Sequence, residues 1–280
     1  MAHNTPSDKG PGEQAQFLDE MDHQLLGWAD PKARLYEALT ANELVLYCQP
    51  VLDLQGGAQF PMAEVLVRLR EEEAALLPPG DFFPVFEHYR MLPDLDRWVV
   101  THVVARLAQG SRIPRLIINV SSQSLEDAGF AKFIADALVA AAVPATNLVF
   151  EIDESDVLYR FEHAVRFAAA VKAIGCEVSI DGFGGRAVSF APLKVLRSDF
   201  LKVDGSIVRN ILRSAVALSK LTAILRVGET IGLSIVAECV EDHDVLVRLR
   251  ALGVRYAQGF GIYEPRPMEA LLGTQAAAQP

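Results

Sequence analysis

The segment from Leu148 to Asp181 reads LVFEIDESDVLYRFEHAVRFAAAVKAIGCEVSID. Its two ends, residues 148–152 and 177–181, are short runs of apolar and β-branched residues, which is typical of buried β-strands. Between them, residues 161–174 carry apolar side chains at three- and four-residue spacing, which predicts a helix. A strand, a helix and a second strand in this order predict two parallel strands joined by a crossover helix.

The same alternation extends along the chain in both directions. Further strands are expected at residues 44–52, 63–69, 116–120, 200–203, 234–238 and 256–257, and further helices at 94–108, 131–142, 207–231 and 242–252. Eight strands that alternate with helices predict an α/β fold, a TIM-like (β/α)8 barrel. The link between the first two strands is short and contains Gly56 and Gly57, so we expect the first strand to run antiparallel to the others.

The two ends of the chain differ in composition from this pattern. Residues 1–30 form an expected disordered leader, rich at its start in Pro, Gly, Ser and charge, with apolar residues from Phe17 to Trp28 at the spacing of a short amphipathic helix. Such a helix would dock on the barrel or on a partner. Residues 31–273 are the expected barrel domain, and residues 274–280 an expected disordered tail.

Composition limits the classes of function. A chain of 280 residues with 51% hydrophobic residues can bury the core of one barrel-sized domain. The formal net charge of -10 argues against a nucleic acid polymer as a partner, because such binding needs clustered cations. The three cysteines, Cys48, Cys176 and Cys239, fit neither a disulfide framework nor a zinc site, so we expect a cytoplasmic protein. No apolar run is long enough to predict a membrane span.

Polar or acidic residues occur at the end of nearly every expected strand. Parallel strands deliver their C-terminal ends to one mouth of a barrel, where catalytic side chains are usually found. Any one of these residues alone is explained as a solvated strand end, but their recurrence is not. Carboxylates that converge there would repel one another without bound cations, and oxygen ligands suit Mg2+ or Mn2+. The residues are Gln49, Glu64, Asn119, Glu151, Asp181, Lys202, Glu238 and Gln258.

The short motifs that contain these residues resemble those of a known family. In order they read YCQP (47–50), AEVLVR (63–68), INVS (118–121), FEIDES (150–155), IDGFG (180–184), LKVD (201–204), AECVE (237–241) and AQGF (257–260). This series is similar to that of EAL-domain cyclic di-GMP phosphodiesterases. The resemblance runs from about Leu35 to about Leu272, which is almost the whole expected barrel.

The resemblance implies a set of roles for individual residues. The implied metal ligands are Glu64, Asn119, Glu151 and Asp181, and the implied catalytic residues are Glu64, Lys202 and Glu238. The implied substrate-binding residues are Gln49, Leu66, Arg68 and Gln258, and the residues implied to support the neighbouring loops are Glu154 and Glu241. The implied reaction opens one phosphodiester bond of cyclic di-GMP to give the linear dinucleotide pGpG with Mg2+ or Mn2+.

The sequence departs from the family pattern at two places. Val65 replaces the alanine of the Glu-Ala-Leu signature, and this position offers no ligand atom. Gly182 stands where active members carry the second of two consecutive aspartates, and the loop then continues as Gly184-Gly185-Arg186. A missing carboxylate weakens a metal site. Arg186 either contacts a phosphate or faces solvent.

Three interpretations therefore stay open. The chain is a phosphodiesterase with reduced activity, or a cyclic di-GMP receptor that does not hydrolyse its ligand and acts through a regulatory protein partner, or a protein-binding barrel with no nucleotide. The retained mouth residues favour the first, Gly182 favours the second, and the third leaves the intact mouth unexplained. The apolar segment 207–231 is compatible with a homodimer interface and equally with ordinary packing on the barrel.

Overall fold

The computed structural model describes residues 30–41, 43–72, 75–77, 79–186 and 189–273. The expected leader, except for Asp30, and the expected tail lie outside these residues. The described elements begin with helix α2 (Pro31–Thr40), which Asp30 caps by accepting a hydrogen bond from the Ala33 N–H. They end with helix α12 (Met268–Leu272).

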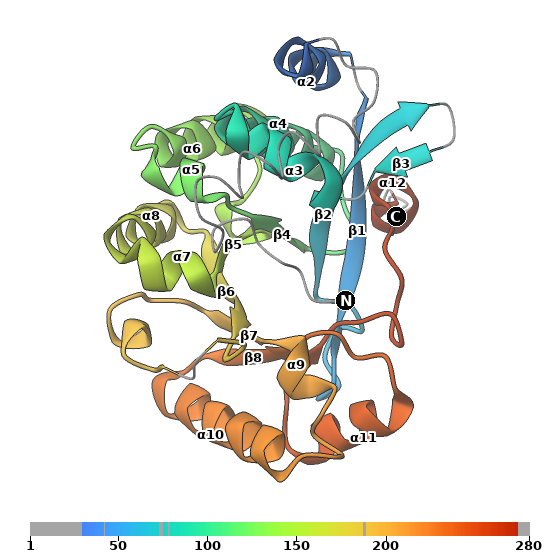
Figure 1. Cartoon of the computed structure of the whole chain (residues 1–280), viewed down its shortest axis with the longest axis vertical. Helices are drawn as coiled ribbons and strands as arrows, with labels where there is room; N and C mark the ends of the chain where they lie inside the picture. The colour runs from blue at the N-terminus through green and yellow to red at the C-terminus, as the bar shows by residue number, and fades with distance from the viewer. Residues whose placement is uncertain (1–29, 42, 73–74, 78, 187–188, 274–280) are drawn as a thin grey trace, which may run out of the picture.

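Eight strands close into a barrel, as the alternation of the sequence predicts (Figure 1). They are β1 (Leu44–Asp53), β2 (Met62–Glu72), β4 (Arg115–Asn119), β5 (Leu148–Asp153), β6 (Glu177–Phe183), β7 (Phe200–Val203), β8 (Ser234–Ala237) and β9 (Tyr256–Ala257). Neighbouring strands from β2 to β9 pair in parallel, whereas β1 pairs antiparallel with β2 on one side and β9 on the other. The antiparallel first strand is confirmed.

Two short strands extend the sheet beyond the barrel, and the sequence pattern did not predict them. Strand β3 (Ala75–Leu77) pairs antiparallel with the end of β2, and β10 (Arg266–Pro267) pairs antiparallel with β1. Both lie next to the reversed strand pair, and their two- or three-residue lengths give too little periodicity to read from sequence.

Helices lie around the barrel, on its outer side (Figure 1). Besides α2 and α12 they are α3 (Pro79–His88), α4 (Leu92–Ala108), α5 (Ser122–Glu126), α6 (Phe130–Ala141), α7 (Glu154–Tyr159), α8 (Phe161–Ile174), α9 (Gly205–Val208), α10 (Ala215–Ile231) and α11 (His243–Ala251). None of the helices in the described ranges is long and apolar enough to cross a membrane.

The expected helix over residues 207–231 is wrong at its first turns. The chain forms the short helix α9, then a turn over residues 209–214, and only then α10. The reason is local, because Asp204 caps α9 and Ser214 caps α10 through hydrogen bonds that their side chains accept from Ser206 N and Ala217 N. Each cap fixes a helix start, so one continuous helix is replaced by two.

The barrel interior is filled by an apolar layer, here called the interior cluster. Its members are all buried, at 5% exposure or less, and each of them except Val51 lies within two residues of the start of its strand: Val51, Met62, Ile117, Val149, Phe200, Val236 and Tyr256. The opposite faces of the same strands pack against the helices in a second, larger cluster. The interior cluster closes the lower part of the barrel, so polar side chains further along the strands lie above an apolar floor.

Candidate active site at the barrel mouth

Strand alternation carries the polar residues to one level above the interior cluster. In the parallel strands the next side chain on the same face is two residues further along, and in the reversed strand β1 it is two residues earlier. Each residue of the interior cluster is therefore followed on the same face by a polar residue of the mouth. The cluster residue and its polar neighbour are Met62 and Glu64, Ile117 and Asn119, Val149 and Glu151, Phe200 and Lys202, Val236 and Glu238, Tyr256 and Gln258, and in β1 Val51 and Gln49.

Lys202 lies at the centre of this level. Its ammonium group donates hydrogen bonds of 2.8 Å to Glu64 Oε2 and 2.8 Å to Glu151 Oε1, and it lies 3.4 Å from Asp181 Oδ1. The side chain comes from β7 and is 3% exposed. One buried cation is therefore shared by three carboxyl groups from β2, β5 and β6.

Amide side chains complete the hydrogen bonding of Glu64. Asn119 Nδ2 donates to Glu64 Oε1 at 2.9 Å, and Gln258 Nε2 donates to Glu64 Oε2 at 2.8 Å. Gln258 Nε2 also lies 3.2 Å from Gln49 Oε1, and Gln49 Nε2 donates to the Tyr263 carbonyl at 2.9 Å. The network joins β4, β2 and β9 to β1, so the reversed strand contributes to the same site.

Burial and charge shift the protonation equilibria of this group in different directions. Burial alone lowers the pKa of Lys202, but Asp181, Glu151 and Glu64 outweigh it and hold the pKa well above its usual value. Burial raises the pKa of Glu64, yet Lys202 and its other donors bring that pKa below its ordinary value. Burial raises the pKa of Glu151 to about 8. The pair Lys202 and Glu64 is thus charged, while Glu151 readily takes up a proton.

Two further acids hold loops at the rim of the mouth. Glu238 Oε1 accepts a 2.7 Å hydrogen bond from Gly205 N, and Glu154 Oε1 accepts a 2.9 Å hydrogen bond from Gly184 N. Burial, followed by the charge of Asp181, raises the pKa of Glu238 to about 7. These contacts tie the segments after β6 and β7 to the residues that follow β5 and β8.

Three of the expected site residues lie away from the central network. Leu66 and Arg68 continue the inward face of β2 beyond Glu64 and are half-buried, and Arg68 lies over the Tyr47 ring at 5.8 Å. Glu241 is exposed in the loop after β8, and its carboxyl group makes no hydrogen bond or ion pair with the described residues. The structure therefore does not bring Glu241 into the group around Lys202.

The donor set suits a hard divalent cation. Glu64, Glu151 and Asp181 supply carboxylate oxygens and Asn119 an amide oxygen, which are ligands of Mg2+ and Mn2+. Asp181 Oδ1 is buried and accepts no hydrogen bond within the described residues. Across the same residues no three His, Cys, Asp or Glu side chains are already arranged around one metal position, and the Lys202 ammonium lies among the carboxyl groups. The residues present fit such an ion.

Gly182 leaves open space beside Asp181. Its φ is +68°, a backbone conformation that glycine adopts easily and that Asp and Asn tolerate better than other residues. A Cβ atom at this position would meet only Asp153 Oδ2, at 4.0 Å. An acid is therefore missing here without any crowding that would exclude one.

The structure adds contacts that the motif positions did not indicate. Ser179 Oγ donates to Glu151 Oε2 at 2.8 Å and so occupies the oxygen that Lys202 does not use. Asp153 lies two residues beyond Glu151 on β5 and is paired in register with Asp181. Strand alternation was the available signal for both residues, because each lies two positions from an expected ligand on the same strand.

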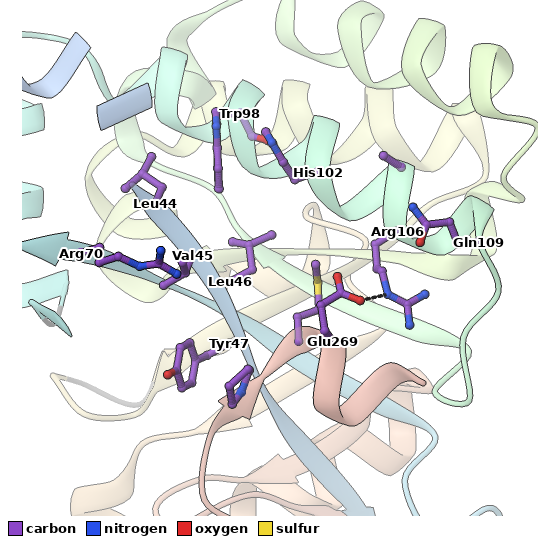
Figure 2. Close-up of a pocket in the computed structure, with 13 residues that line it drawn as sticks. Leu44, Val45, Leu46, Tyr47, Arg70, Trp98, His102, Arg106, Gln109 and Glu269 are labelled. Carbon is purple, nitrogen blue, oxygen red and sulfur yellow. Dashed lines mark hydrogen bonds and ion pairs between the residues drawn. The ribbon is translucent and has the colours of Figure 1, made fainter. Parts of the chain in front are cut away.

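A separate cavity lies outside the barrel (Figure 2). It has a volume of about 480 Å3 and lies between β1, α4 and α12, with Leu44, Trp98 and Met268 among its lining residues. Arg106 and Glu269 join α4 to α12 at its edge through a 2.9 Å ion pair (Figure 2). This cavity is distinct from the mouth, because none of the side chains in the hydrogen-bond network of Lys202 lines it.

The class of protein follows from these features: a closed (β/α)8-like barrel with a reversed first strand and an acidic, lysine-centred mouth. The EAL domain family matches residues 32–265, and the chain belongs to this family. It is 31% identical over 238 residues to the cyclic di-GMP phosphodiesterase PdeF of Escherichia coli K12, covering 84% of this chain and 32% of PdeF. It is 28% identical over 264 residues to the cyclic di-GMP phosphodiesterase PdeB of Shewanella oneidensis, covering 91% of this chain and 30% of PdeB.

Solved structures agree with this assignment. The FimX EAL domain from Pseudomonas aeruginosa bound to c-di-GMP superimposes with a TM-score of 0.79 at 30% identity, covering 85% of this chain and 96% of that one. The PaMucR phosphodiesterase in complex with c-di-GMP also gives a TM-score of 0.79, at 27% identity, covering 86% and 99%. The chain spans about a third of the length of the curated relatives named above.

Proposed function

We propose that this chain binds cyclic di-GMP at the barrel mouth and hydrolyses one of its two phosphodiester bonds to give linear pGpG. The observation that carries the proposal is the buried Lys202 ammonium shared by Glu64, Glu151 and Asp181 above an apolar floor. The similarity to c-di-GMP phosphodiesterases and to barrels bound to c-di-GMP supports the same ligand.

The residues divide into two groups in this proposal. Glu64, Asn119, Glu151 and Asp181 would hold Mg2+ or Mn2+, which when bound lowers the pKa of a water and offsets charge on the phosphate. Lys202 stays protonated and stabilises negative charge that develops on the reacting phosphate. Glu238 orients groups at the rim beside it. The guanine and phosphate of the dinucleotide would contact Gln49, Leu66, Arg68 and Gln258.

A second candidate function has one observation in its favour. The absence of a carboxylate on Gly182 favours a receptor that binds cyclic di-GMP, leaves it intact and passes the signal to a protein partner. Both candidates use the same mouth, so the difference between them is turnover.

One pair of measurements separates the two candidates. Purified protein is incubated with cyclic di-GMP and Mg2+ or Mn2+, and pGpG is quantified by chromatography, while calorimetry measures binding in Ca2+. Turnover that disappears in Glu64→Gln supports the phosphodiesterase. Binding without turnover supports the receptor, and neither binding nor turnover rejects both.

We further propose a cytoplasmic location and pairing of two copies. The described cysteines Cys48, Cys176 and Cys239 are all free thiols, which suits a reducing compartment. Leu212, in the turn before α10, and Val216, in the first turn of α10, are 48% and 68% exposed, and an apolar surface of this kind favours an interface. Light scattering of the purified chain and of Val216→Glu tests the pairing, since a monomer in both cases rejects it.

A further inference from the structure

Asp153 lies at the level of the mouth one step above Glu151. Along β5, Phe150 and Ile152 face the helices and are fully buried, so Glu151 and Asp153 share the opposite, inward face. On the neighbouring parallel strand β6, Asp181 is the residue paired with Asp153 in register. Paired residues on adjacent strands point to the same face about 4.8 Å apart, so two acids lie side by side at the rim.

Only one of the two carboxylate oxygens of Asp153 has a structural role. Oδ1 caps α7 by accepting hydrogen bonds from Ser155 N at 2.7 Å and from Ser155 Oγ. Oδ2 has no hydrogen bond or ion pair with any described residue. It is the atom that lies 4.0 Å from the point where a Cβ of residue 182 would stand. A free carboxylate oxygen therefore borders the space that Gly182 leaves open.

A neighbouring buried carboxyl group has one oxygen that accepts no hydrogen bond. Glu154 is 5% exposed and its Oε2 accepts no hydrogen bond within the described residues, although its Oε1 is bonded to Gly184 N in the loop after β6. Asp181 Oδ1 is buried and likewise accepts no hydrogen bond, although the Lys202 ammonium lies 3.4 Å away. Buried oxygens that accept no hydrogen bond carry a free energy cost that a bound cation removes. These oxygens come from β6 and from the start of α7, on both sides of Gly182.

We propose that Asp153 supplies the carboxylate that Gly182 lacks, as a ligand from β5 for a second divalent cation held together with Asp181. The inference rests on the proposed metal-dependent function of the mouth. In this proposal the acid has moved from position 182 on β6 to Asp153 on the adjacent strand β5, so the charge of the site is kept.

The alternative role of Asp153, capping α7 and nothing more, can be separated from the ligand role by substitution. Asn and Ser are both good N-cap residues, so Asp153→Asn and Asp153→Ser keep the cap and remove the charge. Asp30→Asn is the matched control, because Asp30 caps α2 in the same way through Oδ1 and lies outside the barrel. Thermal unfolding of the metal-free variants checks that the fold is retained.

Mn2+ binding without nucleotide is the readout. Free Mn2+ is measured by electron paramagnetic resonance during titration of the wild type, the three single variants and the double variant Asp153→Ser/Gly182→Asp. We expect Asp153→Ser to weaken one Mn2+ site by about 10-fold or more, because loss of even a supporting group costs that much. Asp30→Asn should bind as the wild type does, and the double variant should regain the lost site.

Each outcome decides the inference independently of turnover. Equal Mn2+ affinity in the wild type and Asp153→Ser overturns it, and so does a wild type that binds no Mn2+. Weaker binding in Asp153→Ser together with recovery in the double variant supports it, even if the protein releases no pGpG. Turnover by the wild type with unchanged binding in Asp153→Ser rejects the role of Asp153 and leaves the proposed function standing.

Discussion

Replacing Lys202 by methionine tests whether the mouth is held by one buried cation. The ammonium group makes two hydrogen bonds of 2.8 Å to carboxylates and is 3% exposed, so the variant leaves Glu64, Glu151 and Asp181 without a counter-charge. Removal of one partner from a buried ion pair costs about 3–5 kcal/mol of unfolding free energy. We expect the lower end of this range, because the raised pKa of Glu151, about 8, lets that group become neutral at pH 7.

The assay is urea unfolding at pH 7 in EDTA, followed by circular dichroism. The control is Lys172→Met, since Lys172 forms a 2.6 Å pair with Asp199 but is 30% exposed, and such a pair contributes about 1 kcal/mol or less. Saturating Mn2+ should reduce the loss in Lys202→Met, because a bound cation stabilises the folded state. A decrease in unfolding free energy of less than about 1 kcal/mol for Lys202→Met in EDTA would refute this prediction, because the carboxyl groups would then not need Lys202 as a counter-charge.

Three further predictions concern residues that are not among the side chains bonded to Lys202. Burial raises the pKa of Asp156 to about 6, so the stability that its proton contributes is present below about pH 4 and is lost as the pH rises through 6. The unfolding free energy of Asp156→Asn relative to wild type should therefore rise by about 2 kcal/mol between pH 4 and pH 6 in urea titrations. Glu269→Ala leaves the buried Arg106 without its carboxylate and should cost about 1–3 kcal/mol by the same method. Gly259→Ala places a Cβ 2.2 Å from the Val240 backbone and should lower the melting temperature by more than about 5 °C in a thermal scan.

Each of these has a result that would contradict it. A constant difference between Asp156→Asn and wild type from pH 4 to 6 would show that burial does not hold that proton. An unchanged Glu269→Ala would mean that the carbonyl of Gly110, 2.6 Å from Arg106 Nη1, is enough for the guanidinium. A Gly259→Ala variant as stable as Gly80→Ala, where φ is not positive and a Cβ meets nothing within 4 Å, would show that the backbone yields without cost.

The barrel was predictable because its signal is repeated and local. Most strands and helices can be predicted from the spacing of their own apolar residues. The short link between residues 53 and 62 indicates the reversed first strand. The break at 209–214 was missed because two capping residues, Asp204 and Ser214, override an apolar pattern that continues on both sides. Capping depends on the backbone conformation of a single residue, which periodicity does not report.

The sequence allowed us to predict which types of residue lie at the mouth, but not which of them contact one another. Glu64, Glu151 and Lys202 were expected together, and their hydrogen bonds agree with that expectation. Asp153 was not expected at the site, because a match of motifs compares position with position along one chain. Its proximity to Gly182 arises from register between two strands, which is a relation across the sheet.

The reversed strand also sets an order for assembly on the ribosome. Strand β1 obtains its second barrel neighbour only from Tyr256 and Ala257, and its pairing with β10 only from residues 266–267. Until those residues have been synthesised, one side of an early, apolar strand has unsatisfied amide and carbonyl groups, a state that invites aggregation or chaperone binding. The barrel therefore cannot close before Ala257 has been synthesised, and a chain that stopped before this residue would leave β1 unpaired on one side.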